Sequence, residues 1–492
     1  MWFYEFLFSS VMISIYHNVY IQMKRAVEVE PTKLTEYPML EEHISVSEVK
    51  TADQNEMLIY DTVTGMRKYP NRAVFNFLKM ATGETSFEEI VKELSLQSGE
   101  PFDTIWPELS QLAEKMVKEG LLKISDFPFE NPRRAPPSVE LVHRLENVSL
   151  EVTNQCNLRC KHCYADSGKK REDELTVSEI KQLIDELADM GVLSITFTGG
   201  EPLMHPHIFE LMEYARKMPL TVVLFTNGTL LTRDVVRKLK ELHVYRVNVS
   251  IDGPDADSHD QFRGVKGSFG KIVQGITYLK EAGIAIHAST SLTKMNYKRV
   301  REILTLLKKL GITDSKLWPP TFSGRSEKPD IFISPEEFRE AVEDMRTFNR
   351  AGMNPEEKTE FRYSRKPENC GVGWSALSVK CNGVVTPCPS FGEDFSLGNV
   401  RKKSVKDMWC NSPFLNKLRK ISVYESEPCK SCEFSGVCTG GCIADVYMRS
   451  GTYSCYDPYM CVVFDVNWND LVPVGVEDVL YSDCALHFQR VG

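Results

Sequence analysis

The chain has 492 residues, of which 42% are hydrophobic and 26% are charged, and its formal net charge is −9 at pH 7. This length exceeds what one ordinary hydrophobic core serves, so we expect two or three domains. Lys and Arg are scattered along an acidic chain, which argues against a nucleic-acid binder held by bulk positive charge.

The first 22 residues are apolar and aromatic, but Glu5, His17 and Asn18 interrupt them. The segment lacks the basic start and the small-residue cleavage site of a signal peptide, and it is short of a clean membrane-spanning helix. An extension or misassigned start, a surface anchor and a buried helix all stay open as interpretations. We predict an N-terminal extension over residues 1–39 and a cytoplasmic chain that does not associate with membranes.

A small domain with three helices and short strands is predicted over residues 40–127. Residues 57–71 fit a hairpin that turns at Thr64 and Gly65, and residues 73–83 have helical spacing. Ser86 is placed to cap the next helix, whose first turn is acidic. Residues 105–118 predict a third helix, and residues 121–124 a short strand.

Strands and helices alternate over the predicted domain at residues 145–345, after a proline-rich linker at 128–144. Strand–helix alternation implies a parallel sheet with right-handed crossovers. Six such units predict an α/β fold, a partial (β/α)6 TIM-like barrel, between a winged-helix-like N-terminal domain and a cysteine-rich C-terminal domain at 346–492. The predicted barrel strands are 147–152, 193–197, 221–225, 244–251, 284–290 and 315–318.

The 14 cysteines are distributed unevenly. Residues 1–155 contain none, three lie within 156–163, and eleven lie between 370 and 484. Disulfide frameworks belong to small secreted domains, whereas this long chain has C-x2-C spacings. Metal binding in a reducing compartment is therefore the better interpretation.

Cys156, Cys160 and Cys163 form a C-x3-C-x2-C arrangement directly after the first barrel strand. A closed zinc site needs four ligands, so three cysteines on one loop leave a metal position open, and thiolates are the ligands of iron–sulfur clusters. The segments TGGEP (198–202), TNG (226–228) and SIDG (250–253) end the next three strands. Glycines permit close approach of a ligand, and Glu201 can pair with an ammonium group.

These motifs resemble the radical S-adenosylmethionine superfamily. The resemblance implies a catalytic [4Fe–4S] cluster on the three cysteines, which binds S-adenosyl-L-methionine and generates a 5′-deoxyadenosyl radical that abstracts hydrogen from a substrate. It also implies a set of cofactor-binding residues: Gly199, Gly200, Glu201, Asn227, Ser250, Tyr164, and Arg263 for the cofactor carboxylate. Ser250 and Arg263 fit structural roles as well, and His162 stands where the family often has an aromatic residue, which leaves the adenine contact open.

The C-terminal cysteines resemble the SPASM extension of radical enzymes that modify peptides and proteins. The resemblance implies two auxiliary clusters, one on Cys370, Cys388 and Cys442 with Cys381 as the candidate fourth ligand, and one on Cys429, Cys432, Cys438 and Cys461. Cys455 competes with Cys461, which the preceding Asp457-Pro458 pair favours. Cys410 and Cys484 are expected to be free cysteines, and zinc is the alternative metal because C-x2-C pairs occur in zinc ribbons.

Residues 40–127 resemble the PqqD-like peptide-recognition domain fused to many peptide-modifying radical enzymes, which implies a strand edge to which a leader peptide adds. A generic accessory domain is the alternative. We therefore predict a radical S-adenosylmethionine oxidoreductase, or maturase, that crosslinks or oxidises a peptide or protein and takes electrons from a ferredoxin or flavodoxin. An enzyme for a small molecule, such as a tetrapyrrole or metal-cofactor precursor, and a non-catalytic iron–sulfur carrier are the alternatives. The intact GGEP and SIDG segments disfavour the carrier.

Overall fold

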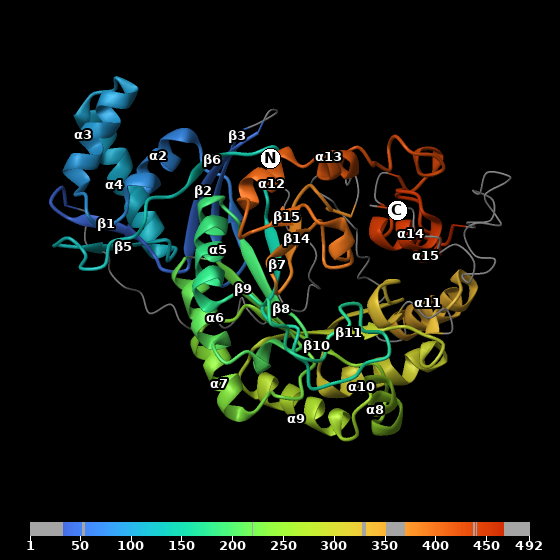
Figure 1. The fold of residues 1–492 in the computed structure, drawn as a ribbon. Coiled ribbons are helices and arrows are strands. Elements are labelled where there is room, and N and C mark those ends of the chain that lie inside the picture. The colour runs from blue at the N-terminus through green and yellow to red at the C-terminus, as the bar shows by residue number, and fades with distance from the viewer. Residues whose placement is uncertain are drawn as a thin grey trace.

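The structure is a computed structural model that describes residues 33–51, 55–218, 220–326, 331–350, 370–435, 438 and 440–466. Figure 1 shows a small N-terminal domain in blue, a central strand–helix region in green and yellow, and a C-terminal region in orange and red. The expectations for residues 1–22 and for Cys484 lie outside the described residues.

The described part of the N-terminal domain combines two small sheets with three α-helices. Its sheets have the strand orders β4-β3-β2-β6 and β1-β5. The predicted hairpin is confirmed, because Tyr60 pairs with Arg67 across a turn in which Gly65 has φ +74°. Ser86 caps α3 in a reciprocal capping box with Glu89. The elements are β1 (Tyr37–Leu40), β2 (Ile44–Lys50), β3 (Asn55–Asp61), β4 (Arg67–Lys68), α2 (Arg72–Met80), α3 (Phe87–Ser98), α4 (Phe102–Lys118) and β5 (Leu122–Ser125).

Two details of this domain differ from expectation. Helix α4 starts at Phe102 rather than at residue 105, because the extended Pro101 precedes its first turn. The segment predicted to be a linker contains β6 (Ser138–Glu140), which pairs in parallel with β2. The connection is therefore built into the N-terminal sheet.

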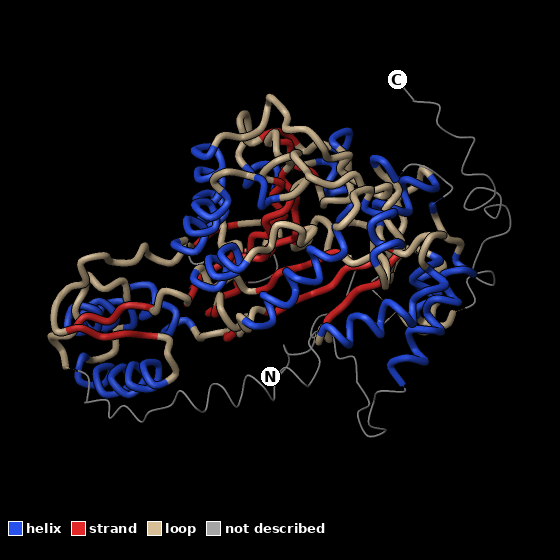
Figure 2. The backbone as a smooth tube through the Cα atoms, turned by 90° about the horizontal axis from the view of Figure 1, so that it is seen from below, coloured by secondary structure: helices blue, strands red, loops and turns tan. Residues whose placement is uncertain are grey.

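A nine-stranded sheet forms the centre, in the order β12-β11-β10-β9-β8-β7-β13-β14-β15. Strands β7 to β12 are consecutive and all parallel, which confirms the partial barrel. Figure 2 shows these strands running through the middle of the molecule with helices around them. The strands are β7 (Asn147–Glu151), β8 (Ser194–Thr198), β9 (Thr221–Thr226), β10 (Arg246–Ser250), β11 (Ala285–Ser291) and β12 (Asp314–Trp318). The helices are α5 (Val177–Asp189), α6 (Ile208–Lys217), α7 (Arg233–Glu241), α8 (Ala256–Arg263), α9 (Ser268–Glu281), α10 (Val300–Leu310) and α11 (Pro335–Arg350).

The two faces of this sheet differ in polarity. Val148, Ile195, Val222 and Val247 alternate onto the face that belongs to the main hydrophobic core with the helices. The opposite, concave face carries mostly polar residues, including the directly paired row Asn248, His287 and Asp314. The interior of the partial barrel is therefore polar, whereas its outer face belongs to the hydrophobic core.

The C-terminal region continues the same sheet, which the sequence did not predict. Strand β13 (Ala376–Val379) pairs in parallel with β7, and the hairpin strands β14 (Val384–Thr386) and β15 (Gly398–Asn399) follow it. The α-helices among the described residues of this region are α12 (Val405–Asn411), α13 (Pro413–Arg419), α14 (Ile443–Ser450) and α15 (Pro458–Val463). Strand β13 has only four residues and lies outside the strand–helix alternation from which the barrel strands were predicted.

The N-terminal domain docks where the barrel strands begin. Arg67 forms a two-pronged ion pair with Glu146, at 2.9 and 3.0 Å, just before β7. The Thr221 hydroxyl, at the start of β9, donates to the Tyr60 oxygen at 3.2 Å. The domain thus sits at the edge of the sheet opposite to the carboxyl ends of the parallel strands.

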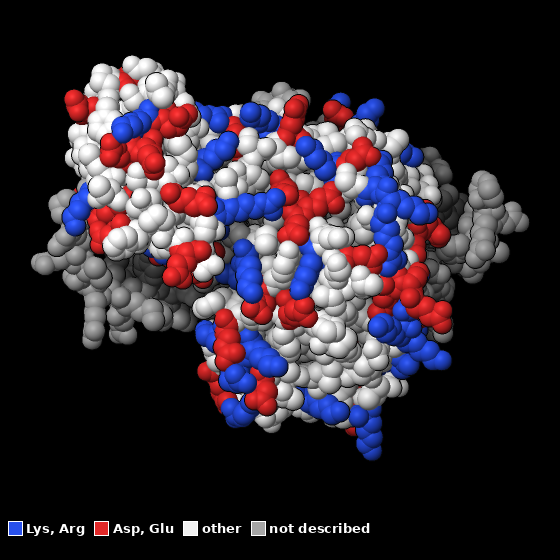
Figure 3. Space-filling model, turned by 60° about the vertical axis from the view of Figure 1, so that its left-hand side comes forward, with Lys and Arg blue, Asp and Glu red and all other residues white. Residues whose placement is uncertain are grey.

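The surface carries both charge signs. Figure 3 shows Lys and Arg interspersed with Asp and Glu on the face that it presents. Within the described part of the chain, no helix combines the length and the apolar character needed to cross a membrane.

Candidate functional site

The loop between β7 and α5 carries the three predicted cysteines and is folded back on itself. The Cys156 amide donates to the Gly168 carbonyl at 3.0 Å, and the Gly168 amide donates to Asn154 at 2.9 Å. Burial, with the nearby Glu201 and the other two cysteines, raises the pKa of Cys156 to about 11. Three thiols thus lie close enough to repel one another as thiolates, which a bound cation would relieve.

Gly199 and Gly200 hold this loop against the end of β8. A Cβ atom on Gly199 would lie 2.4 Å from the Thr153 carbonyl oxygen, and one on Gly200 would lie 2.4 Å from that of Gln155. The Gly200 and Glu201 amides each donate at 2.8 Å, to Thr153 and Gln155 respectively. The two glycines are therefore required for close packing of the segment that leads into Cys156.

Glu201 is fully buried and accepts three hydrogen bonds. They come from the Thr226 hydroxyl at 2.8 Å, the Asn227 amide at 2.8 Å and the Leu203 amide at 3.1 Å. Burial raises the pKa of Glu201 to about 7, against the opposing effect of these donors. A carboxylate has about four acceptor positions, so one remains for an ammonium group.

The other predicted cofactor contacts have varied surroundings. The Asn227 side chain donates to Asn157 at 2.9 Å and accepts from Thr229, which ties the third strand end to the cysteine loop. Ser250 ends β10 on the concave face. Burial, with Glu151 and Cys163, raises the pKa of Tyr164. Arg263 is paired with Asp252 at 2.5 Å, and its guanidinium also donates to the Cys160 sulfur at 3.5 Å.

The second predicted set of C-terminal cysteines is brought together. Cys429, Cys432, Cys438 and Cys461 line one cavity, whose other lining residues are mostly apolar: Val423, Pro428, Phe434, Ser435, Tyr456, Phe464 and Val466. Cys455 is hydrogen-bonded to Cys429 but does not line this cavity. Cys461 lines the cavity with the other three cysteines, and its choice over Cys455 as the last ligand stays a prediction.

The first predicted set is brought together only in part. Electrostatic interactions connect Cys442 with both Cys388 and Cys370, and the backbone of Ile443 hydrogen-bonds to Cys370. Burial raises the pKa of Cys388 to about 11, and Cys370 adds to this shift.

Cys381 follows Lys380 directly and is buried. Burial raises its pKa to about 12, and the charged groups that act on it are Glu151, Glu174, Arg171 and Asp173. These neighbours come from β7 and from the segment that precedes α5, and the assignment of Cys381 as fourth ligand of the first set stays a prediction. Cys410, on α12, interacts with Arg419.

A buried ion pair beside the site was missed by sequence reasoning. Glu151, which ends β7, pairs with Lys380, which follows β13, at 2.9 Å, and both side chains are less than 10% exposed. Lys380 also donates to the Pro389 carbonyl at 3.2 Å, and its ammonium lies 5.8 Å from the centre of the Tyr164 ring. The only signal in the sequence is a charged residue at the end of β7 and another just after β13, and the pairing of the two strands is needed to interpret it.

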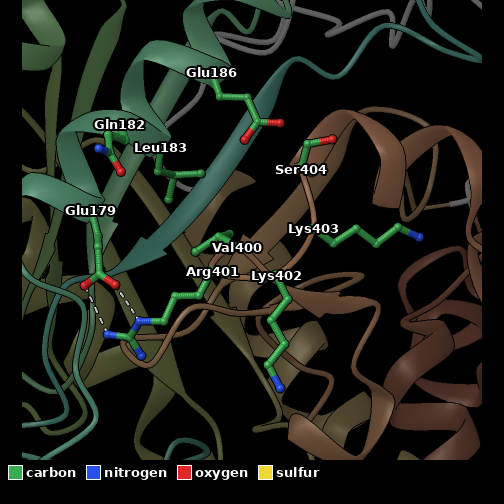
Figure 4. A pocket seen from close by; sticks show the side chains of 9 residues that line it. All are labelled: Glu179, Gln182, Leu183, Glu186, Val400, Arg401, Lys402, Lys403 and Ser404. Atoms are coloured by element: carbon green, nitrogen blue, oxygen red, sulfur yellow. Dashed lines mark hydrogen bonds and ion pairs between the residues drawn. The ribbon is translucent and has the colours of Figure 1, made fainter.

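A surface hollow between α5 and the loop after β15 lies apart from these residues. Figure 4 shows Arg401 aimed at Glu179, with which it is paired at 2.6 Å, while Lys402 and Lys403 extend away from them. The hollow contains none of the predicted site residues; it is lined by Glu179, Gln182, Leu183, Glu186, Val400, Arg401, Lys402, Lys403 and Ser404.

Comparisons with known proteins identify two domains. Residues 150–307 match the radical SAM superfamily, and residues 370–433 match an iron–sulfur cluster-binding domain, SPASM. An AdoMet-dependent heme synthase of Methanosarcina barkeri is 33% identical over 63% of this chain and 95% of its own length. This chain belongs to the radical SAM superfamily.

Two further likenesses are to a bacteriocin biosynthesis protein and to a protein solved with a precursor peptide. The subtilosin biosynthesis protein AlbA of Bacillus subtilis is 32% identical to this chain, over 60% of this chain and 66% of AlbA. The crystal structure of Streptococcus suis SuiB bound to the precursor peptide SuiA aligns with a TM-score of 0.60 at 16% identity, covering 85% of this chain and 98% of SuiB. At that identity the likeness establishes a shared fold.

The radical SAM domain binds a [4Fe–4S] cluster and S-adenosylmethionine, and the SPASM domain binds auxiliary iron–sulfur clusters. The site fits these groups, because it offers three thiols on one loop, a glycine-walled strand end and a buried carboxylate with an acceptor position to spare. Among the described residues, no three His, Cys, Asp or Glu side chains surround a single ion position. A four-iron cluster takes each thiolate on a separate iron, so its ligands are spread around a larger volume.

Proposed function

We propose that Cys156, Cys160 and Cys163 hold the catalytic cluster and that the chain modifies a peptide or protein by radical chemistry, through crosslinking or side-chain oxidation. The observation that carries the radical core is the packing of the GGE segment against the cysteine loop, with Glu201 buried beside Cys156. When bound, the cluster and S-adenosylmethionine together supply a 5′-deoxyadenosyl radical that abstracts hydrogen from the substrate.

The predicted site residues have the following tasks in this proposal. Gly199 and Gly200 let the strand end approach the cysteine loop, and Glu201 receives the cofactor ammonium at its remaining acceptor position. Asn227 holds the loop through Asn157, and Ser250 and Tyr164 border the cofactor. The auxiliary clusters are assigned to Cys370, Cys388 and Cys442, and to Cys429, Cys432, Cys438 and Cys461. A ferredoxin- or flavodoxin-type protein supplies the electrons.

We place the substrate against the concave face of the sheet, which carries Asn248 and His287. Phe225 is 41% exposed although it lies on a central strand, and it is paired with Asn248 and next in register to His287. The buried Asn248 side-chain oxygen has no hydrogen-bond partner among the described residues, and His287 is held by Asp314 at 2.9 Å. An exposed aromatic ring beside an acceptor without a partner suits a peptide group, which brings an N–H donor.

A peptide substrate is supported by the N-terminal domain and its position. The fold likeness to SuiB extends over 85% of the chain, well beyond the radical SAM and SPASM domains. We assign residues 40–127 to PqqD-like leader recognition, with the barrel at 145–345 and the auxiliary domain at 346–492. The N-terminal domain docks where the strands begin, and a five-residue strand spans about 17 Å. About five extended residues would therefore reach the cysteine-loop edge.

The first test is anaerobic. The reconstituted protein is analysed for iron and sulfide and then given dithionite and S-adenosylmethionine. About twelve irons per chain, for three four-iron clusters, and formation of 5′-deoxyadenosine are expected. Cys156→Ala should abolish the cleavage while leaving the auxiliary iron in place, and full cleavage by this variant would refute the assignment.

A small tetrapyrrole is the second candidate substrate, favoured by the 33% identity to heme synthases. The two classes separate in one assay of 5′-deoxyadenosine formation. Iron-coproporphyrin III is added in one arm, and short peptides encoded beside the gene are added in the other. A peptide-dependent rise with no rise on the porphyrin supports the proposal, and the reverse result replaces it with the tetrapyrrole reaction.

A further inference from the structure

Arg263 joins the cysteine loop to a buried carboxylate. It is the last residue of α8, it is 6% exposed, and its two terminal nitrogens have different partners. One is paired with Asp252 at 2.5 Å, and the other donates to the Cys160 sulfur at 3.5 Å. The main chain adds to this connection, because the Arg159 amide donates to the Arg263 carbonyl at 3.0 Å.

Asp252 is itself fixed from two sides. Its other carboxylate oxygen accepts from the Ser291 amide at 2.8 Å, and its carbonyl accepts from Asn296 at 2.9 Å. Asp252 is therefore a rigid support on the barrel that orients the Arg263 guanidinium. The guanidinium fork stays charged and presents its N–H groups in a fixed geometry, so its direction at Cys160 is set by the fold.

Hydrogen bonds and nearby charge at the ligand sulfurs are what set the reduction potential of an iron–sulfur cluster. We propose that Arg263 is a positioning residue that fixes Cys160 and makes the cluster easier to reduce, and that it is not the ligand of the cofactor carboxylate. This inference rests on the proposed assignment of the catalytic cluster to Cys156, Cys160 and Cys163. The inference also gives Asp252, the aspartate of the SIDG segment, a role, which is to orient Arg263.

The test compares Arg263→Gln with the wild-type protein, both reconstituted. The midpoint potential of the cluster is measured by a redox titration followed by electron paramagnetic resonance, without S-adenosylmethionine, and the cofactor dissociation constant is measured separately. We expect the ratio of reduced to oxidised cluster at a fixed potential to fall at least tenfold, which is about 59 mV for one electron. The dissociation constant should stay within threefold.

Arg325→Gln is the matched control. Arg325 serves the same loop, but it donates to the main-chain oxygens of Cys160 and Ser167, at 3.0 and 2.8 Å, and not to a sulfur. Its potential shift should be clearly smaller. Equal shifts in the two variants would mean that charge near the loop, and not the bond to Cys160, sets the potential, and would overturn the proposal.

Asp252→Asn and Arg263→Lys keep the proposal testable if Arg263→Gln does not assemble its clusters. Asp252→Asn leaves the guanidinium charge unneutralised, so the midpoint potential of the cluster should rise. Arg263→Lys should lower the midpoint potential by less than Arg263→Gln does. An unchanged potential with tenfold weaker cofactor binding in Arg263→Lys would assign Arg263 to the carboxylate and overturn the inference. A wild-type protein without a reducible cluster would instead refute the proposed function.

Discussion

Replacement of Gly200 by alanine tests whether the GGE strand end determines the position of the cysteine loop. A Cβ at this position would lie 2.4 Å from the Gln155 oxygen and 2.7 Å from both the Asn154 oxygen and the Gln155 carbonyl carbon, whereas ordinary contact begins at 3.4 Å. The loop must then move by roughly 1 Å, and all three obstacles are backbone atoms that cannot rotate away. Gly200 is not among the residues with positive φ, so the cost is purely steric.

The displacement has two measurable consequences. Overpacking of this kind costs about 1–3 kcal/mol of stability, and a misplacement of about 1 Å at a reacting centre costs about a hundredfold in rate. We expect 5′-deoxyadenosine formation to fall about a hundredfold while the melting temperature falls by only a few degrees.

Gly270→Ala is the control, because Gly270 lies in α9 with open space around its missing Cβ. There the change should raise stability slightly, by about 0.5–1 kcal/mol, since alanine is the better helix former. Wild-type cleavage by Gly200→Ala would contradict the proposed role of the GGE packing.

Three further outcomes follow from the site. Because burial raises the pKa of Glu201 to about 7, its carboxylate is neutralised as the pH falls from 8 to 6. In an equilibrium binding assay, S-adenosylmethionine should therefore bind roughly tenfold more weakly at pH 6 than at pH 8. The Glu201→Gln variant is the control: ionisation of the cofactor affects both proteins equally, so the variant should lack only the loss that is due to Glu201. Cys438→Ala should remove about four irons per chain in an iron assay, whereas Cys410→Ala should remove none, and equal iron in both would reject the cavity assignment. Lys380→Met should lower stability by about 3–5 kcal/mol, because it leaves the Glu151 charge buried alone, and Glu151→Leu in the same chain should recover most of the loss in thermal unfolding.

The barrel was predictable because each unit is locally consistent. Strand β8 lies within one residue of its predicted range, and in the structure Thr176 and Glu179 form a capping box at the start of α5. In β7, the buried Val148 and Leu150 alternate with Ser149, which is the period-2 pattern of a strand. Short-range signals of this kind determine elements and their order, and the right-handed crossover rule then determines the parallel sheet.

Long-range pairings were not predictable in the same way. Strand β13 has four residues, and β6 has three within a proline-rich segment, so neither carries enough periodicity to indicate a partner. The same limit applies to the site. The spacing of Cys156, Cys160 and Cys163 is visible in the sequence, but the contact of Arg263 with Cys160 depends on how α8 returns to the loop.

The pairing of β13 with β7 determines how the two cysteine regions are related in space. Parallel strands end at the same edge of a sheet, so the residues after β7, which lead to Cys156, and those after β13, which lead to Cys388, emerge side by side. Lys380 then joins the two edges through Glu151 and the carbonyl next to Cys388. Their separation is therefore set by backbone hydrogen bonds and a buried ion pair, and not by a flexible connection. For the proposed catalytic and auxiliary clusters, such a fixed separation would keep the distance over which an electron passes between them constant.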